Sequence, residues 1–167
     1  MKIVPLNIEG LSADDNWLIE SRMQKILDSW EGTPHMDGQQ AKGMGVDCVR
    51  FVAAVLDELI GTKTPIKHLP SDTAFHQRDK AVAGMRLFIK QFDGYRIGPD
   101  EPLQAGDVLV TGPRSGGPGH AMIVGPDGFI WQSAYKKVIK SGLESMSVTV
   151  YKHKATMRVR NRERWNV

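Results

Sequence analysis

The sequence predicts one α+β domain in which N-terminal helices pack on an antiparallel β-sheet. Apolar residues recur at helical spacing in the first part of the chain, and short apolar or alternating runs bounded by glycine and proline follow in the second part. The two kinds of segment do not alternate, so a βαβ arrangement is not indicated. With 167 residues, 41% of them hydrophobic, the chain can bury a core as a single domain over 1–167.

The first predicted helix covers residues 13–30. Ser12 and Asp15 have the spacing of a capping box, which marks the start of a helix. The apolar positions that follow near-helical spacing are Trp17, Leu18, Met23, Ile26, Leu27 and Trp30, and we expect both tryptophans in the core. The glycine-rich stretch 31–45 then predicts a loop.

A second helix is predicted to stop at Gly61 and to carry Cys48, which directly follows Asp47, in its first turn. Its apolar stripe consists of Val49, Val52, Leu56 and Leu59. A third helix is predicted from residue 72 or 73 to about residue 92.

Strands are predicted over 107–112, 120–125 and 129–134, followed by alternating segments over 147–153 and 156–162. The Pro-Asp-Gly sequence at 126–128 predicts a turn that pairs the second strand with the third. Arg158, Arg160 and Arg162 fall on one face of the last strand. The favoured interpretation is a solvated strand face, rather than a surface for an anionic polymer, a virion partner or nucleic acid.

Composition excludes few functions. The net charge of +3 does not by itself indicate binding to nucleic acid or to a membrane, and the single cysteine cannot form an internal disulfide. The first residues lack the apolar core of a signal peptide, and no segment has the length of a membrane span. We therefore expect synthesis in the cytoplasm without a signal peptide.

Cys48 has two interpretations. A helix N-terminus offers unpaired N–H groups and partial positive charge, which favour a thiolate and can hold an oxyanion. A lone cysteine beside an apolar helix stripe is, on the other hand, commonly an inert packing residue. The position alone leaves both open.

A cysteine nucleophile needs a base and a group that orients the base. His120 is the preferred candidate among five histidines, because it begins a predicted strand directly after a glycine-rich turn. If the strands at 120–125 and 129–134 pair, the oxygen of the Gln132 amide can accept the imidazole N–H. Alternation leaves open whether Trp131 or Gln132 faces the histidine.

Five segments in order resemble the NlpC-type family of cell-wall cysteine peptidases, a circularly permuted papain-like group. They are GTPHMDG, GVDCVRFV, LQAGDVLV, GHAMIVG and FIWQSA. The longer stretch SWEGTPHMDGQQAKGMGVDC is especially similar to a branch that bacteriophages encode with their tail genes. The resemblance covers most of the chain and implies a papain-like fold, with the nucleophile at a helix start on an antiparallel sheet or half-barrel.

The resemblance implies that Cys48 is the nucleophile, His120 the base and Gln132 the orienting residue. It implies hydrolysis of amide bonds in peptidoglycan stem peptides through an acyl-enzyme, with no metal or organic cofactor. The sequence itself, which has no recognised nucleic-acid motif and no membrane span, predicts neither nucleic acid nor a membrane as a partner. Phage tail proteins are the implied partners, and the virion tail is the implied location.

Residues His35, Asp47 and Arg50 are the candidates for substrate or oxyanion binding. His35 stands where relatives carry a tyrosine that polarises the substrate, and an imidazole N–H would replace the hydroxyl. Gln132 stands where many relatives have histidine, and Val49 and Arg50 replace a Ser-Gly pair. Arg50 would either crowd the cleft or pair with a substrate carboxylate. These departures keep an alternative open: an inactive structural or wall-binding module of a phage tail with the same fold. Acyl transfer to another substrate is a third possibility.

Overall fold

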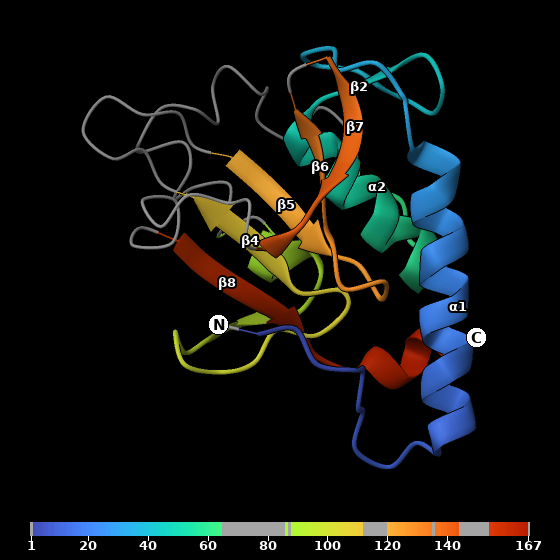
Figure 1. Cartoon of the computed structure of the whole chain (residues 1–167), viewed down its shortest axis with the longest axis vertical. Coiled ribbons are helices and arrows are strands. Elements are labelled where there is room, and N and C mark those ends of the chain that lie inside the picture. The colour runs from blue at the N-terminus through green and yellow to red at the C-terminus, as the bar shows by residue number, and fades with distance from the viewer. Residues whose placement is uncertain are drawn as a thin grey trace.

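Two N-terminal helices pack on a six-stranded antiparallel sheet (Figure 1), so the predicted α+β class is confirmed. The structure is a computed structural model that describes residues 2–64, 86, 88–111, 120–134, 136–143 and 154–166. None of the helices in these ranges is long and apolar enough to cross a membrane.

Helix α1 (Ala13–Trp30) has the predicted bounds and the predicted capping box. The Ser12 hydroxyl accepts the Asp15 N–H at 3.0 Å, and the Asp15 carboxylate accepts the Ser12 N–H at 3.4 Å. Two N–H groups at the helix start are thus satisfied, which explains why the helix begins here.

The expectation that Trp17 lies in the core is wrong. Trp17 is 63% exposed and Leu18 is 50% exposed, whereas Trp30 is buried. The inner face of α1 instead runs through Asn16 and Ile19, because the Asn16 side chain accepts the N–H of Ile8 and donates to the Ser12 carbonyl. A satisfied amide can be buried, and residues 17 and 18 then face outward.

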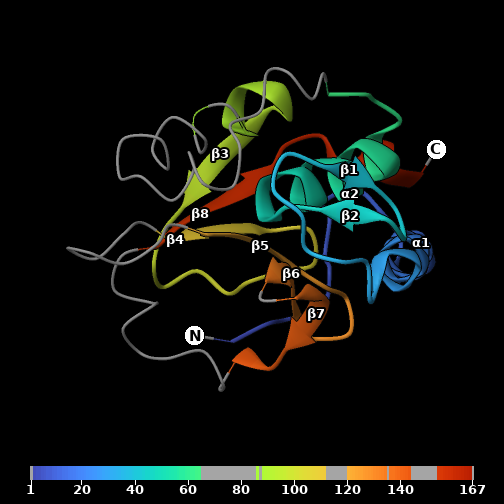
Figure 2. The same ribbon diagram turned by 90° about the horizontal axis from the view of Figure 1, so that it is seen from above.

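Helix α2 (Cys48–Ile60) has Cys48 in its first turn and stops at Gly61, as predicted. It ends at Gly61, whose φ of 79° lies in the left-handed region that glycine adopts at helix ends. Nearly every α2 side chain is buried, because α2 lies between the sheet and α1 (Figure 2).

The segment predicted as a loop contains a small two-stranded sheet. Strands β1 (Gln40–Ala41) and β2 (Gly45–Val46) pair antiparallel just before α2. This hairpin fixes the path by which the chain reaches Asp47.

The large sheet has the order β3-β8-β4-β5-β6-β7, and every neighbouring pair is antiparallel (Figure 2). Its strands are β3 (Gly94–Ile97), β4 (Val108–Thr111), β5 (His120–Val124), β6 (Ile130–Ala134), β7 (Lys137–Ser141) and β8 (Lys154–Val159). The strands β5 and β6 are joined through the predicted turn at 126–128 and pair at Ile123–Trp131 and Val124–Ile130.

Strands β4, β5 and β6 match predicted ones, whereas β3 and β7 were not predicted. The strand predicted over 156–162 overlaps β8 but ends at Val159, and Arg162 instead begins the 3-10 helix η3 (Arg162–Asn166). The short strand β3 follows helical residues 88–91 after a two-residue turn, and β7 is an edge strand with little alternation. The predicted third helix lies outside the described residues up to residue 85 and at residue 87, as does the predicted strand at 147–153.

Each face of the sheet carries an apolar cluster. Helix α2 packs on the face that includes Ala121, Ile123 and Trp131. Met122, Val124 and Ile130 belong to the second cluster, together with Leu103. The N-terminal segment runs along this second cluster through hydrogen bonds between Val4 and Leu103 and between Leu103 and Lys2.

Arg158 is a buried ion-pair partner and not part of a solvated face, so that interpretation was wrong. Its Nε and Nη2 donate to the two oxygens of Asp107 at 2.9 and 2.7 Å, and Nη2 also donates to the Pro102 carbonyl. The pKa of Arg158 is raised, mainly by this hydrogen-bonded pair. The neighbouring Arg160 is exposed, as predicted.

We predict that Arg158→Met lowers the free energy of unfolding by about 3–5 kcal/mol, because it leaves the Asp107 carboxylate buried without its counter-charge. Arg160→Met is the matched control, since Arg160 meets Asp93 at 3.7 Å in an exposed pair. Arg160→Met should lower the free energy of unfolding by no more than about 1 kcal/mol. Urea unfolding of both variants makes the comparison, and equal losses would contradict the prediction.

Candidate active site

Asp47 caps helix α2 and is fully buried. Its Oδ1 accepts the backbone N–H of Arg50 at 2.8 Å, and its Oδ2 accepts the backbone N–H of Gly38 and the Nη1 of Arg50, each at 2.8 Å. One carboxylate therefore starts the helix, fastens the preceding loop and pairs with a buried guanidinium.

Burial raises the pKa of Asp47 above its ordinary value. The N–H groups of Arg50 and Gly38 and the charge of Arg50 oppose this shift but do not overcome it. The cap therefore takes up a proton at a higher pH than an exposed aspartate does.

Cys48 is the first residue of α2 and has no exposed surface. Its side chain belongs to the apolar cluster that also contains Val49, Phe51 and Trp131. The helix N-terminus supplies the N–H groups and dipole that favour a thiolate, while complete burial is typical of a packing cysteine. Each of the two interpretations of Cys48 therefore has one structural observation in its favour.

The predicted contact between His120 and Gln132 is present. His120 Nε2 lies 2.8 Å from Gln132 Oε1, and Gln132 Nε2 donates to Ser141 Oγ at 3.2 Å. Because an amide oxygen only accepts, His120 carries its proton on Nε2 in this arrangement. These two hydrogen bonds link Ser141 on β7, Gln132 on β6 and His120 on β5. Because Nε2 faces Gln132, the other ring nitrogen of His120, Nδ1, does not.

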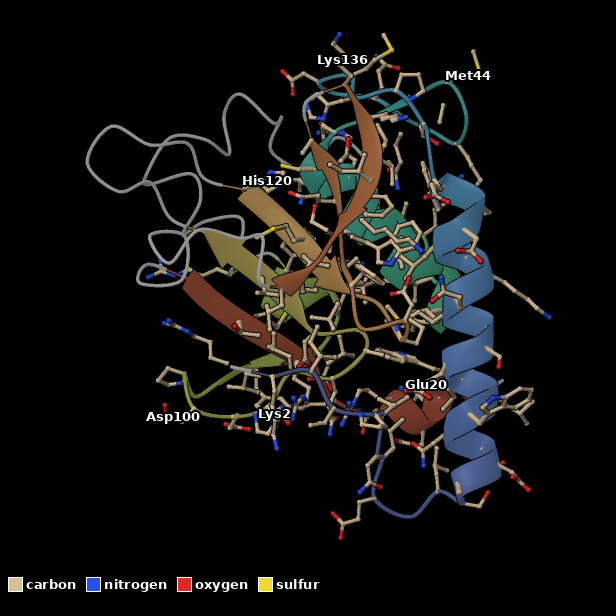
Figure 3. All side chains as sticks on the ribbon, viewed as in Figure 1. Lys2, Glu20, Met44, Asp100, His120 and Lys136 are labelled. Carbon is tan, nitrogen blue, oxygen red and sulfur yellow. The ribbon has the colours of Figure 1, made fainter. Side chains whose placement is uncertain are left out.

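The starts of α2 and β5 lie at the same end of the molecule. Both elements run in the same general direction and α2 packs against β5 (Figure 1). Figure 3 shows His120 at this end, and Lys136 and Met44 also lie there. The fold thus brings the elements that carry the predicted nucleophile and base together from distant parts of the sequence.

His35 is held beside the start of α2. Its backbone N–H donates to the Lys136 carbonyl at 2.9 Å, and it forms a bridge with Val46. The His35 Nδ1 lies 2.8 Å from Ser133 Oγ, and Ser133 Oγ donates to the Val46 carbonyl at 2.8 Å. The ring is half-buried and contacts β6 one residue beyond Gln132.

The guanidinium of Arg50 lies inside the protein, on Asp47. It is 5% exposed, so it neither extends into solvent nor stands apart as a group for a ligand. A substrate carboxylate could pair with Arg50 only by displacing part of the capping interaction of Asp47.

Ser133 and Ser141 were not identified from the sequence, although each contacts one of the residues that were. Serine in a strand carries no specific signal, and the strand β7 that holds Ser141 was itself not predicted. Alternation along β6 gives one indication for Ser133. Consecutive side chains of a strand point to opposite faces, so a strand that directs Gln132 to one face directs Ser133 to the other.

Within the described ranges, no group of three or more histidine, cysteine or acidic side chains is arranged to hold a metal ion. No protein-family model matches the chain, and no curated protein matches it significantly.

The raised pKa of Asp47 gives the pH dependence of stability a definite sign. Between the ordinary value of 3.8 and the raised value, the folded protein binds more protons at Asp47 than the unfolded chain does. The contribution of Asp47 is therefore present at low pH and is lost as the pH rises through this window.

We predict that the advantage of wild type over Asp47→Asn in unfolding free energy shrinks as the pH rises from about 3.8. Urea unfolding of both proteins at a series of pH values measures this difference. An advantage that grows with pH would mean that the pKa of Asp47 is lowered in the folded protein.

Proposed function

We propose that this protein is a cysteine hydrolase of the NlpC type, with Cys48 as nucleophile, His120 as base and Gln132 as the residue that orients the base. The observation that most supports this proposal is the 2.8 Å contact between His120 Nε2 and Gln132 Oε1. His120 is the first residue of β5, and the start of β5 lies near the start of α2. The five ordered sequence segments that resemble that family support the same roles.

The contact of His120 Nε2 with Gln132 supports a route for the proton transfers that such a reaction needs. With its proton on Nε2 and held by Gln132, His120 would exchange protons through Nδ1. His120 Nδ1 takes the proton of the Cys48 thiol, and the thiolate then attacks the amide carbonyl while the N–H groups at the start of α2 stabilise the oxyanion. His120 then protonates the leaving amine, and afterwards it takes a proton from the water that releases the acid product.

The proposed substrates are stem peptides of bacterial peptidoglycan, and the proposed setting is a phage tail whose proteins are the partners. Substrate and setting rest on the sequence resemblance, including the stretch from Ser29 to Cys48 that is similar to the phage branch. The proposal includes a papain-like fold formed by a single domain over 1–167, and its chemistry needs no metal or organic cofactor.

A second candidate function is a structural or wall-binding module of the same fold that has no turnover. The observation that favours it is the complete burial of Cys48, together with the guanidinium of Arg50 buried two residues further on. A substrate must reach the sulfur for hydrolysis, whereas a binding module has no such requirement.

We predict that wild type cleaves defined muropeptides and that Cys48→Ala does not, with mass analysis of the products as the measurement. The Cys48→Ala variant keeps a small apolar side chain in the cluster, so folding should be preserved and can be checked by circular dichroism. Intact muropeptides with both proteins would contradict the hydrolase and leave the binding module.

The reactivity of the thiol separates the two functions without a substrate. If the protein is the hydrolase, iodoacetamide alkylates Cys48 at pH values well below the ordinary thiol pKa of about 8.5. His120→Ala abolishes this alkylation at low pH. In the binding module, the thiol reacts slowly at every such pH and His120→Ala changes little.

We predict that Gln132→Ala lowers turnover, because His120 loses the acceptor that orients it. The loss should be smaller than the factor of about 10²–10⁴ that acid–base catalysis as a whole contributes. Gln132→Glu is the matched control, since a carboxylate keeps an acceptor for His120 and can accept from the Ser141 hydroxyl. Steady-state kinetics on a muropeptide distinguishes them. Equal losses in both variants would mean that the hydrogen bond to His120 is not what matters.

A further inference from the structure

The Ser133 hydroxyl links a second histidine to the backbone of β2. Ser133 is fully buried, and its Oγ lies 2.8 Å from both the Val46 carbonyl oxygen and His35 Nδ1. The Val46 carbonyl also accepts the N–H of Met36, so both of its acceptor sites are used.

Counting protons assigns the donor in each contact. A hydroxyl has one proton and a carbonyl has none to give, so the proton between Ser133 and Val46 must be that of Ser133. If Ser133 instead donated to His35, two oxygen acceptors would face each other at 2.8 Å in a buried site, which is unfavourable. Ser133 Oγ must therefore accept a hydrogen bond from His35 Nδ1–H.

We infer that Ser133 is a positioning residue that fixes the neutral ring of His35 in the Nδ1–H tautomer. The His120 ring has the opposite tautomer, with its proton on Nε2. The consecutive β6 residues Gln132 and Ser133, whose side chains point to opposite faces of the strand, therefore set opposite tautomers on two imidazoles.

This assignment changes the role expected of His35, and the change rests on the proposed function. A tyrosine hydroxyl at this place would donate to a substrate carbonyl. With Nδ1–H committed to Ser133, the Nε2 of a neutral His35 has no proton to give, so the ring cannot take over the donor role of a tyrosine hydroxyl. The ring could donate from Nε2 only after it gains a proton there.

The tautomer can be read directly from ¹⁵N NMR of protein labelled at histidine, at a pH where the rings are neutral. We expect a pyrrole-type shift for His35 Nδ1 and a pyridine-type shift for Nε2, with the reverse for His120. A His35→Gln spectrum assigns the ring. A pyrrole-type Nε2 on His35 in wild type would overturn the inference, and this measurement needs no variant other than the one used for assignment.

Two serine variants test whether Ser133 is the cause. Ser133→Ala should move the His35 nitrogens toward averaged shifts and leave His120 unchanged, whereas Ser141→Ala should leave His35 unchanged. Unaltered His35 shifts in Ser133→Ala would overturn the positioning role. A protein that shows the expected tautomers but cleaves no muropeptide would contradict the hydrolase alone, so the two failures are distinguishable.

Discussion

The buried carboxylate of Asp47 determines where helix α2 begins. It accepts N–H groups from both sides of the helix start, one from Arg50 and one from the loop at Gly38. A start displaced by one residue would rotate the side chain at position 48 by about 100° around the helix axis. The orientation of the single sulfur, and the distance from β2 to the helix, therefore depend on this one cap.

Local sequence signals were sufficient for the bounds of α1 and for the end of α2. Ser12 with Asp15, and Gly61, are capping residues whose hydrogen bonds form within a few residues, so their positions followed from the sequence. The predictions that failed concern residues whose position depends on partners distant in the chain. Trp17 faces outward because Asn16 bonds to Ile8, and Arg158 is buried because Asp107 lies beside it.

The candidate site likewise combines contacts that local sequence predicts with contacts that it does not. A short turn joins the strands of His120 and Gln132, so the sequence predicted that residue 131 or 132 lies near His120, and the structure shows that it is Gln132. The contact between His35 and Ser133 joins residues 98 positions apart, and no local pattern predicts it. The burial of Cys48 is likewise a tertiary property, since the cap that precedes it is compatible with both an exposed and a covered thiol.

The turn between β5 and β6 has a consequence for both imidazoles. A side chain on Gly125 would come within about 2.6 Å of Asp127 and Trp131, so glycine is required where the turn leaves β5. If a substitution there shifted β6 by a single position, Gln132 and Ser133 would exchange sides of the sheet. Both rings would then lose their partners together, although this hairpin bend lies at the far end of β5 from His120.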